Sequence, residues 1–226
     1  MRIHQITQKT GKYSLLLICL LIALILFPVL EDYKIGHICL TLWCLISLVT
    51  TALTLQDNKH VFRKIVLSGG ILFVLVVATL LSQLFGWQTQ FIYHWSLPTA
   101  IVFFAYIAWI IVSSIFKQKE LSADELSGAI VVYLLIGITW ALLYSYIELL
   151  YPNSFSFVSA DDLQAKGSAL FYYSFVTLTT LGYGDILPAS QFARMVAYLE
   201  AVSGVMYTAI LVAGLVGHIG NQKHTS

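Results

Sequence analysis

The chain has 226 residues, of which 59% are hydrophobic and only 10% are charged, and its formal net charge is +1. Because a soluble domain carries about 25% charged residues, this composition excludes an ordinary soluble protein and predicts an integral membrane protein surrounded by membrane lipids. The near-neutral charge also argues against a nucleic-acid partner, which would require a basic surface.

Six apolar runs follow one another along the chain, each long enough to cross about 30 Å of hydrocarbon as a helix. Their ranges are 14–30, 35–55, 65–86, 91–116, 127–151 and 191–218. Basic residues precede the first run as in a signal peptide, but no small-x-small cleavage site follows it, so we predict an uncleaved span. Cys19, Cys39 and Cys44 fall inside these runs without metal-ligand spacing and are interpreted as small hydrophobic residues. The sequence therefore predicts an all-helical protein with six transmembrane helices.

The first four runs are predicted to form an N-terminal transmembrane unit, residues 1–118. The fourth run contains no lysine or arginine, whereas a voltage-sensing span carries basic residues that feel the membrane field. We therefore expect a structural or regulatory unit without steep voltage sensing. His94 lies near the outer end of this run, and an interfacial position is a simpler interpretation than a proton sensor.

The distribution of basic residues predicts the orientation in the membrane. With six spans, the N-terminus, the second and fourth connections and the C-terminus share one side, which holds most of the 12 lysine and arginine residues. The other side holds only Lys34, Lys166 and Arg194. Because cytoplasmic connections are enriched in basic residues, both termini are predicted to be cytoplasmic. We expect a multi-pass protein of the cell membrane, of prokaryotic type.

Residues 119–226 are predicted to form a second unit. Ser122 and Glu125 are spaced as a capping box, which would start the fifth span. Between the fifth and sixth spans lies an apolar stretch, 169–181, that is too short to cross the membrane. We predict that this stretch is re-entrant, which is tolerated where protein or a water-filled cavity surrounds it.

The re-entrant stretch is predicted to contain a short helix capped by Ser168. The negative end of its dipole would favour a cation at its C-terminus. Tyr172 and Tyr173 lie on this helix, where they can brace the residues that follow it.

The motif TLTTLGYGDILP follows the short helix. A cation that crosses a membrane must exchange its water shell for protein oxygens, which successive backbone carbonyls can supply. A backbone that alternates between right- and left-handed dihedrals can direct these carbonyls to one axis, and the left-handed positions favour glycine. Gly182 and Gly184, on either side of Tyr183, meet this requirement. Thr180 adds a hydroxyl at the inner end, and Asp185 adds negative charge at the outer mouth.

The segment TTLGYGD resembles the selectivity-filter signature of potassium channels, usually written T-V-G-Y-G-D. The order of outer helix, pore helix, filter, Pro188 and inner helix is also similar, whereas the first half of the chain is similar at most in topology. The resemblance implies a homotetramer, because four filters surround one axis and this chain carries one. It also implies potassium ions bound at the filter residues Thr180, Leu181, Gly182, Tyr183 and Gly184.

The filter region departs from the resembled family in two places. Leu181 stands where valine is usual, which bears on packing behind the filter and on how strictly potassium is selected. Tyr172 and Tyr173 stand where many relatives have tryptophans.

Glu200 and Gly204 lie inside the sixth span. A carboxylate exposed to lipid is costly, so we expect Glu200 to face the protein interior and to support the filter, with Ser174 or Thr177 as partner. Gly204 lies where the resembled channels carry a hinge glycine, and a hinge and close helix packing are both open interpretations.

An inner gate is predicted from helical spacing. If Gly204 faces the pore, steps of four place Thr208, Val212 and Val216 on the same stripe. Apolar valines at a narrow pore end can close it by dewetting.

Two other charged residues are predicted near the outer ends of these spans. Glu148 is interpreted as an interfacial residue. Arg194 is expected to pair with Asp185, Asp161 or Asp162.

The function predicted from the sequence is a potassium-selective channel that conducts passively, without a cofactor other than the permeant ions. An enzyme is excluded because the sequence has no catalytic nucleophile, no pair of catalytic bases and no cluster of metal ligands at a usable spacing. A weakly selective cation channel is the first alternative. A secondary transporter with a broken helix is the second, but such proteins carry paired interrupted segments and this chain has one.

Overall fold

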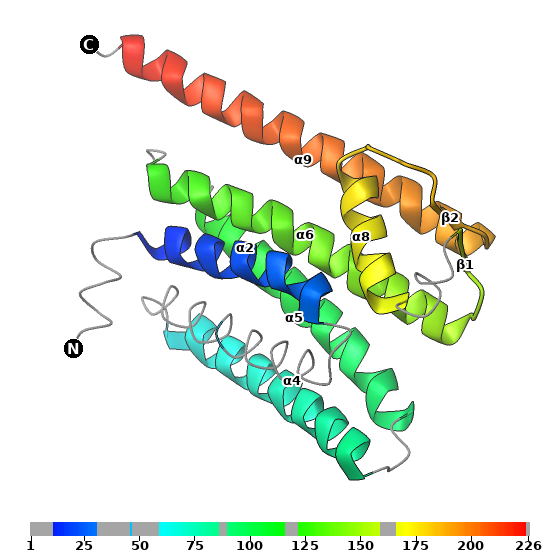
Figure 1. Cartoon of the computed structure of the whole chain (residues 1–226). Helices are drawn as coiled ribbons and strands as arrows, with labels where there is room; N and C mark the ends of the chain where they lie inside the picture. The colour runs from blue at the N-terminus through cyan, green and yellow to red at the C-terminus, as the bar shows by residue number, and fades with distance from the viewer. Residues whose placement is uncertain are drawn as a thin grey trace.

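A computed structural model describes residues 11–30, 46, 59–85, 90–115, 122–158 and 166–224. This part of the chain is folded almost entirely into helices (Figure 1). The helices are α2 (Lys12–Leu30), α4 (Lys59–Phe85), α5 (Gln90–Ile115), α6 (Ala123–Leu150), α8 (Lys166–Leu178) and α9 (Gln191–His224). Two short strands, β1 (Phe155–Phe157) and β2 (Ile186–Pro188), flank α8 in the sequence.

Three helices of the described part are long and apolar enough to cross a membrane. They are His94–Ile115 in α5, Ala123–Leu150 in α6 and Gln191–Gly214 in α9. The first and third predicted spans correspond to helices α2 and α4, while the second, 35–55, lies outside the described residues. The structure thus supports a membrane protein with several apolar helices.

The strands were not predicted. β1 and β2 form an antiparallel pair in which Phe155 lies opposite Pro188 and Phe157 opposite Ile186. Three-residue strands carry too little alternation to be recognised in an apolar sequence. The purely helical prediction is therefore wrong in these two segments, which lie where α6 ends and α9 begins.

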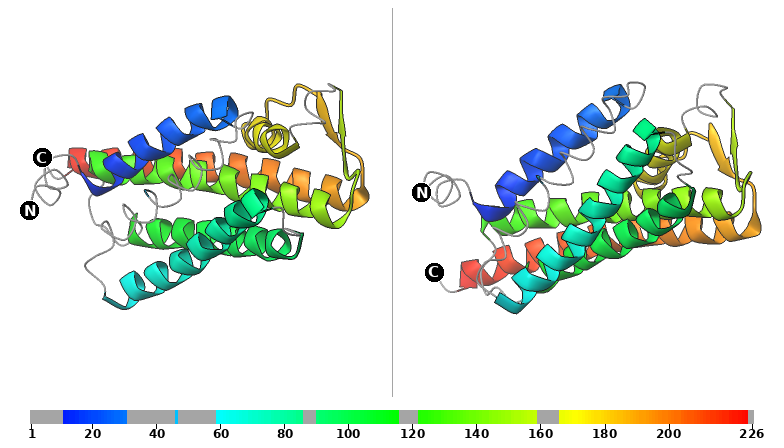
Figure 2. Two further views of the ribbon diagram at one scale, coloured as in Figure 1. Left: turned by 60° about the horizontal axis from the view of Figure 1, so that its bottom comes forward. Right: turned by 90° about the horizontal axis from the view of Figure 1, so that it is seen from below.

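The long helices alternate in direction. α2, α4 and α6 run toward the end of the molecule that carries the strands, whereas α5 and α9 run away from it (Figures 1 and 2). The starts of α2, α4 and α6 therefore lie at the same end as the C-terminal end of α9, as the predicted order of spans requires. α6 is the central helix, because it contacts α2, α5, α8 and α9.

The main core lies between α2, α5 and α6. Its buried members recur every three or four residues along each helix, which is the spacing of one helix face. They include Leu16, Leu20, Phe103, Phe104, Ile107, Ile111, Val131, Val132, Leu135 and Ile138. Other faces of these helices are also apolar: Val102 is 68% exposed and Trp109 is 70% exposed. Apolar residues on the outside are what contact with lipid requires.

The N-terminal end of α2 is capped by a residue from α6. The carboxylate of Asp124 accepts hydrogen bonds from the backbone N–H groups of Lys12, Tyr13 and Ser14 at 2.9, 2.9 and 3.0 Å. Gly11 fits beside it with a φ of 63°, and a Cβ there would lie 2.3 Å from the Asp124 Oδ1. The first turn of α2 is thereby fixed to the first turn of α6.

Replacing Asp124 by alanine is expected to lower the free energy of unfolding by about 1 to 2 kcal/mol, as removal of a helix N-cap does. Thermal unfolding of the purified protein in detergent measures this loss. Glu125→Gln is the matched control, because Glu125 serves the capping box of its own helix and its amide keeps an acceptor. Equal stability of the Asp124 variant and wild type would contradict the capping role.

Candidate ion-conduction site

The segment that follows α8 has an alternating backbone. The φ angles are positive at Thr180 (60°), Gly182 (58°) and Gly184 (80°), so every second residue is left-handed. The sequence predicted this conformation at the two glycines, and that prediction is confirmed. A Cβ at Gly182 or at Gly184 would meet no atom within 4 Å. Glycine is therefore favoured there by the backbone conformation and not by lack of space.

Thr180 adopts the same conformation although it is β-branched. Such a residue rarely has a positive φ, and strained backbone of this kind is concentrated at functional sites. Hydrogen bonds to the end of α8 hold this strained conformation. The N–H of Thr180 donates to Thr177 O at 2.9 Å, and the N–H of Leu181 donates to Val176 O at 2.9 Å. Within the described residues, no N–H donates to the backbone carbonyls of residues 180–183.

The C-terminal end of this segment is held in place through Asp185. Its carboxylate accepts a hydrogen bond from the Tyr172 hydroxyl at 2.7 Å and another from the backbone N–H of Ile186 at 3.1 Å. Arg194 instead donates to the carbonyl of Pro188 at 3.0 Å. The predicted pairing of Arg194 with Asp185 is therefore wrong, because Tyr172 is the partner. The alternatives Asp161 and Asp162 lie outside the described residues.

Tyr172→Phe removes only the hydroxyl of this contact and is expected to weaken the hold on Asp185 by about 1 kcal/mol. The outer mouth should then lose its conducting arrangement more readily, so that ion flux in liposomes declines faster with time. Asp185→Asn keeps one acceptor oxygen, and the double variant should add little to Tyr172→Phe. Fully additive effects would show that the two side chains act independently.

Tyr173 lies in an apolar environment, unlike Tyr172. It is buried, with its ring centroid 5.1 Å from that of Tyr144 on α6 and 5.5 Å from that of Phe155 on β1. Aromatic edge contacts at these distances stabilise packing beyond the area they bury. The two tyrosines predicted to support the filter therefore act differently, one through a hydrogen bond and one through an aromatic cluster.

Glu200 is completely buried between three helices. Its carboxyl group is hydrogen-bonded to the hydroxyls of Ser174 on α8 and Tyr144 on α6. The prediction that Glu200 faces the interior and meets Ser174 is confirmed. Tyr144 was missed, since a tyrosine in an apolar run carries no sequence signal for a partner 56 residues away.

Gly204 lies directly against the end of α8. A Cβ at this position would be 2.2 Å from the carbonyl oxygen of Leu178, so the conformation described requires glycine for close packing. Thr208 and Val212 are exposed in the single chain, and Val212 is 57% exposed. The side chain of Val216 lies outside the described residues. The inner gate thus stays a prediction.

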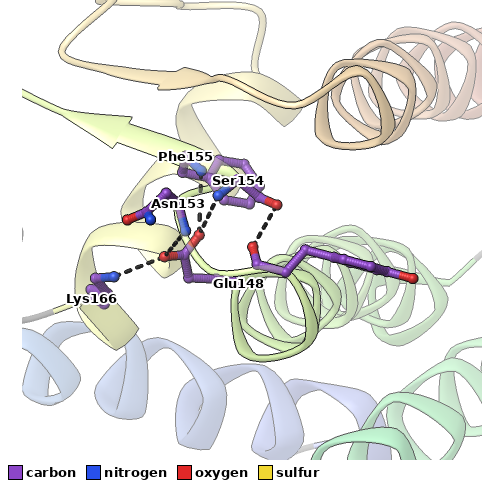
Figure 3. Close-up of polar contacts among 6 residues, drawn as sticks. Glu148, Asn153, Ser154, Phe155 and Lys166 are labelled. Atoms are coloured by element: carbon purple, nitrogen blue, oxygen red, sulfur yellow. Dashed lines mark hydrogen bonds and ion pairs between the residues drawn. The ribbon is translucent and has the colours of Figure 1, made fainter.

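Glu148 connects the C-terminal end of α6 with the turn before β1 and the start of α8. It is 8% exposed, and its carboxylate accepts from the backbone N–H groups of Asn153, Ser154 and Phe155 at 3.1, 2.9 and 3.3 Å (Figure 3). Lys166, the first residue of α8, forms an ion pair with it at 2.8 Å. The prediction of Glu148 as an interfacial residue did not include these contacts, and its place relative to the membrane stays a prediction. The turn at Pro152 and Asn153 was the available signal.

The described part of the C-terminal unit thus combines an outer helix, a short helix, a strained alternating segment and an inner helix. Residues 128–219 match the family model described as ion channel. The match covers less than half of the chain and shows that this segment is similar to ion channels. We refer to residues 128–219 as the pore module. The family that this segment matches is one of channels and not of enzymes.

Several curated proteins to which this chain is similar are named as potassium channels. Potassium voltage-gated channel subfamily A member 6 of Mus musculus is 29% identical over 111 residues, which are 48% of this chain and 19% of the relative. Subfamily A member 5 of Mustela putorius furo is 29% identical over 111 residues, 48% of this chain and 17% of the relative. Shaker-related potassium channel tsha2 of Oncorhynchus mykiss is 29% identical over 106 residues, 46% of this chain and 20% of the relative.

These matches span about a fifth of the relatives' own length. No solved structure gives a significant match to the chain. The family model matches residues 128–219 only, so this comparison bears on the pore module and not on the N-terminal unit.

Proposed function

We propose that this chain forms a potassium-selective channel, through which potassium ions cross the cell membrane passively. The observation that carries the proposal is the left-handed backbone at Thr180, Gly182 and Gly184, within a pore module whose relatives are named as potassium channels. Backbone carbonyls on such a segment can replace the hydration shell of an ion.

The proposed ion ligands are the backbone carbonyls of the filter together with the hydroxyl of Thr180. The carbonyls belong to Thr180, Leu181, Gly182, Tyr183 and Gly184. These residues are exposed in the single chain, with Leu181 55% and Tyr183 67% exposed. Oxygen is the only ligand atom in this set, which suits a hard alkali cation. The only cofactors in the proposal are the permeant potassium ions.

The proposed assembly is a homotetramer embedded in membrane lipids. One filter segment cannot surround an ion, so several copies must meet at a common axis. The inner helix α9 supports this, because one chain leaves many of its apolar side chains uncovered. They include Tyr198, Val202, Val205, Met206 and Ile210, all at least 50% exposed. Neighbouring copies and lipid together would cover them.

The end of the molecule that carries the starts of α2, α4 and α6 is proposed to face the cytoplasm, because most basic residues belong to connections at that end. Thr208, Val212 and Val216 are then at the cytoplasmic half of α9, where the proposed dewetting gate lies. The relatives are named as voltage-gated, but α5 contains no lysine or arginine. We therefore propose gating without steep voltage dependence.

The test is ion flux into liposomes that contain the purified protein, compared for potassium, rubidium and sodium. Potassium and rubidium flux well above sodium flux is the expected result. Similar flux of potassium and sodium would favour the weakly selective cation channel, for which Leu181 would be the first residue to replace by valine. Flux that requires a co-transported ion or a gradient of another solute would favour the transporter.

A further inference from the structure

Three helices meet at one completely buried carboxyl group, that of Glu200 on α9. The Tyr144 hydroxyl on α6 bonds to its Oε2, and the Ser174 hydroxyl on α8 bonds to its Oε1. Ser174 also lies 2.8 Å from the backbone carbonyl of Gly137 on α6. Glu200, Tyr144 and Ser174 are each exposed by less than 1%. Their hydrogen bonds must therefore be satisfied within the protein.

The number of hydrogens in this cluster can be counted. The Ser174 hydroxyl carries one hydrogen, and the carbonyl of Gly137 can only accept. If Glu200 were ionised, its carboxylate and the carbonyl of Gly137 would compete for the single hydrogen of Ser174. Gly137 lies inside α6, where its carbonyl also accepts the N–H bond of the helix. The group left short of a donor would therefore be the buried carboxylate, which is costly.

A protonated Glu200 removes this conflict. Its acid hydrogen donates from Oε1 to the Ser174 oxygen, and Ser174 donates to the carbonyl of Gly137. Oε2 accepts from Tyr144 as before. Each of the three acidic or hydroxyl hydrogens of the cluster then has one acceptor, and each of its three hydrogen bonds has one donor.

The charge environment agrees with the hydrogen count. Within the described residues, no lysine, arginine or histidine forms an ion pair with Glu200. An ionised carboxylate buried without a cation is strongly unfavourable. Among the residues that the structure describes, the donors that reach the Glu200 carboxyl group are two neutral hydroxyls.

We propose that Glu200 is the protonated acid in the folded protein and that it positions the pore helix α8 by donating to Ser174. The chain of bonds from Tyr144 through Glu200 and Ser174 to Gly137 joins α6, α8 and α9 without placing a fixed charge behind the filter. This positioning role rests on the proposed channel function, whereas the protonation of Glu200 does not. Glu200 touches no ion in this proposal.

Infrared spectroscopy of the purified protein tests the protonation state without any measurement of flux. The difference between the spectra of wild type and Glu200→Gln at neutral pH should contain the carbonyl band of a protonated carboxyl group, and this band should shift in D2O. A difference spectrum with carboxylate bands only would overturn the proposal. It would leave the channel function untouched.

Substitutions test the positioning role. The amide of Glu200→Gln can donate to Ser174 and accept from Tyr144, so this variant should keep its thermal stability and its potassium flux within about twofold of wild type. Glu200→Leu leaves both hydroxyls with an apolar neighbour, and its flux per folded protein should fall by about tenfold or more. Failure of Glu200→Gln to fold, or equal flux of the Gln and Leu variants, would contradict the proposal.

Serine variants provide the matched comparison. Ser174→Ala breaks the chain of bonds and should reduce flux and stability even when Glu200 is intact. Ser145→Ala is the control, because among the described residues the Ser145 hydroxyl donates to the carbonyl of Ala141 in its own helix. Equal behaviour of the two alanine variants would overturn the positioning role. If wild-type protein shows no potassium flux, the channel proposal fails, while the infrared and stability results still decide the state of Glu200.

Discussion

Gly182→Ala is expected to lower potassium flux into liposomes by about a hundredfold or more while the chain remains folded, because a non-glycine residue with positive φ costs about 1 to 3 kcal/mol. Gly182 has a φ of 58°, and the added Cβ would meet no atom within 4 Å. The cost is therefore backbone strain alone. It would be repeated in each of the four copies around the proposed pore, and each 1.4 kcal/mol corresponds to about tenfold in an equilibrium.

The matched control for this prediction is Gly70→Ala on α4. A Cβ at Gly70 would also meet no atom within 4 Å, but Gly70 has no positive φ. This variant should keep full flux and unchanged or slightly higher stability, since alanine is the better helix former. Undiminished, potassium-selective flux in Gly182→Ala would show that the left-handed backbone at this residue does not hold the ion ligands.

Gly204→Ala is expected to lower both thermal stability and potassium flux. The new Cβ would lie 2.2 Å from the carbonyl oxygen and 3.0 Å from the Cδ1 of Leu178. The nearest atom belongs to the backbone, so no side-chain rotation can relieve the contact and the end of α8 must move. Overpacking of this kind costs about 1 to 3 kcal/mol in a well-packed interior. The filter begins two residues after Leu178, so the displacement should reach it.

A pure hinge role for Gly204 predicts a different outcome. Alanine would then change opening while thermal stability stayed at the wild-type value. Gly214→Ala is the control on the same helix, because a Cβ there meets no atom within 4 Å. Adding Leu178→Ala to Gly204→Ala should restore little, since the backbone oxygen remains. Full rescue by the second substitution would place the conflict in the side chain and contradict the backbone contact.

The local features of the site could be predicted from the sequence because they depend on neighbours in the chain. Two glycines around a tyrosine predicted the alternating backbone, and it is observed at Gly182 and Gly184. The short helix was also expected, although α8 begins at Lys166, a few residues before the predicted range. Glu200 could be assigned to the interior because a carboxyl group in lipid is costly. These predictions rest on backbone conformation, helix length and burial.

The remaining contacts could not be predicted because they join segments far apart in the sequence. Each of these contacts depends on how two helices are rotated against each other. They are the Tyr144–Glu200 hydrogen bond, the packing of Gly204 against Leu178 and the capping of α2 by Asp124. In an apolar membrane sequence almost every face of a helix is hydrophobic, so the pattern carries little information on that rotation. The contacts of Glu148 were missed for a different reason: most of them are to a turn that follows a few residues later, and this local signal was not used.

The cap on α2 has a consequence for the biogenesis of the protein. Lys12 and Asp124 are 112 residues apart, and ribosomes add about 5 to 20 residues per second. The first helix therefore waits roughly 6 to 22 s for its capping carboxylate to be synthesised. During this interval the free amides of its first turn need water or lipid headgroups, because hydrocarbon cannot satisfy them. The N-terminal helix thus reaches its final anchorage only once α6 has emerged, and a nascent chain that stalls before α6 would present an unanchored first helix to the quality-control proteases of the membrane.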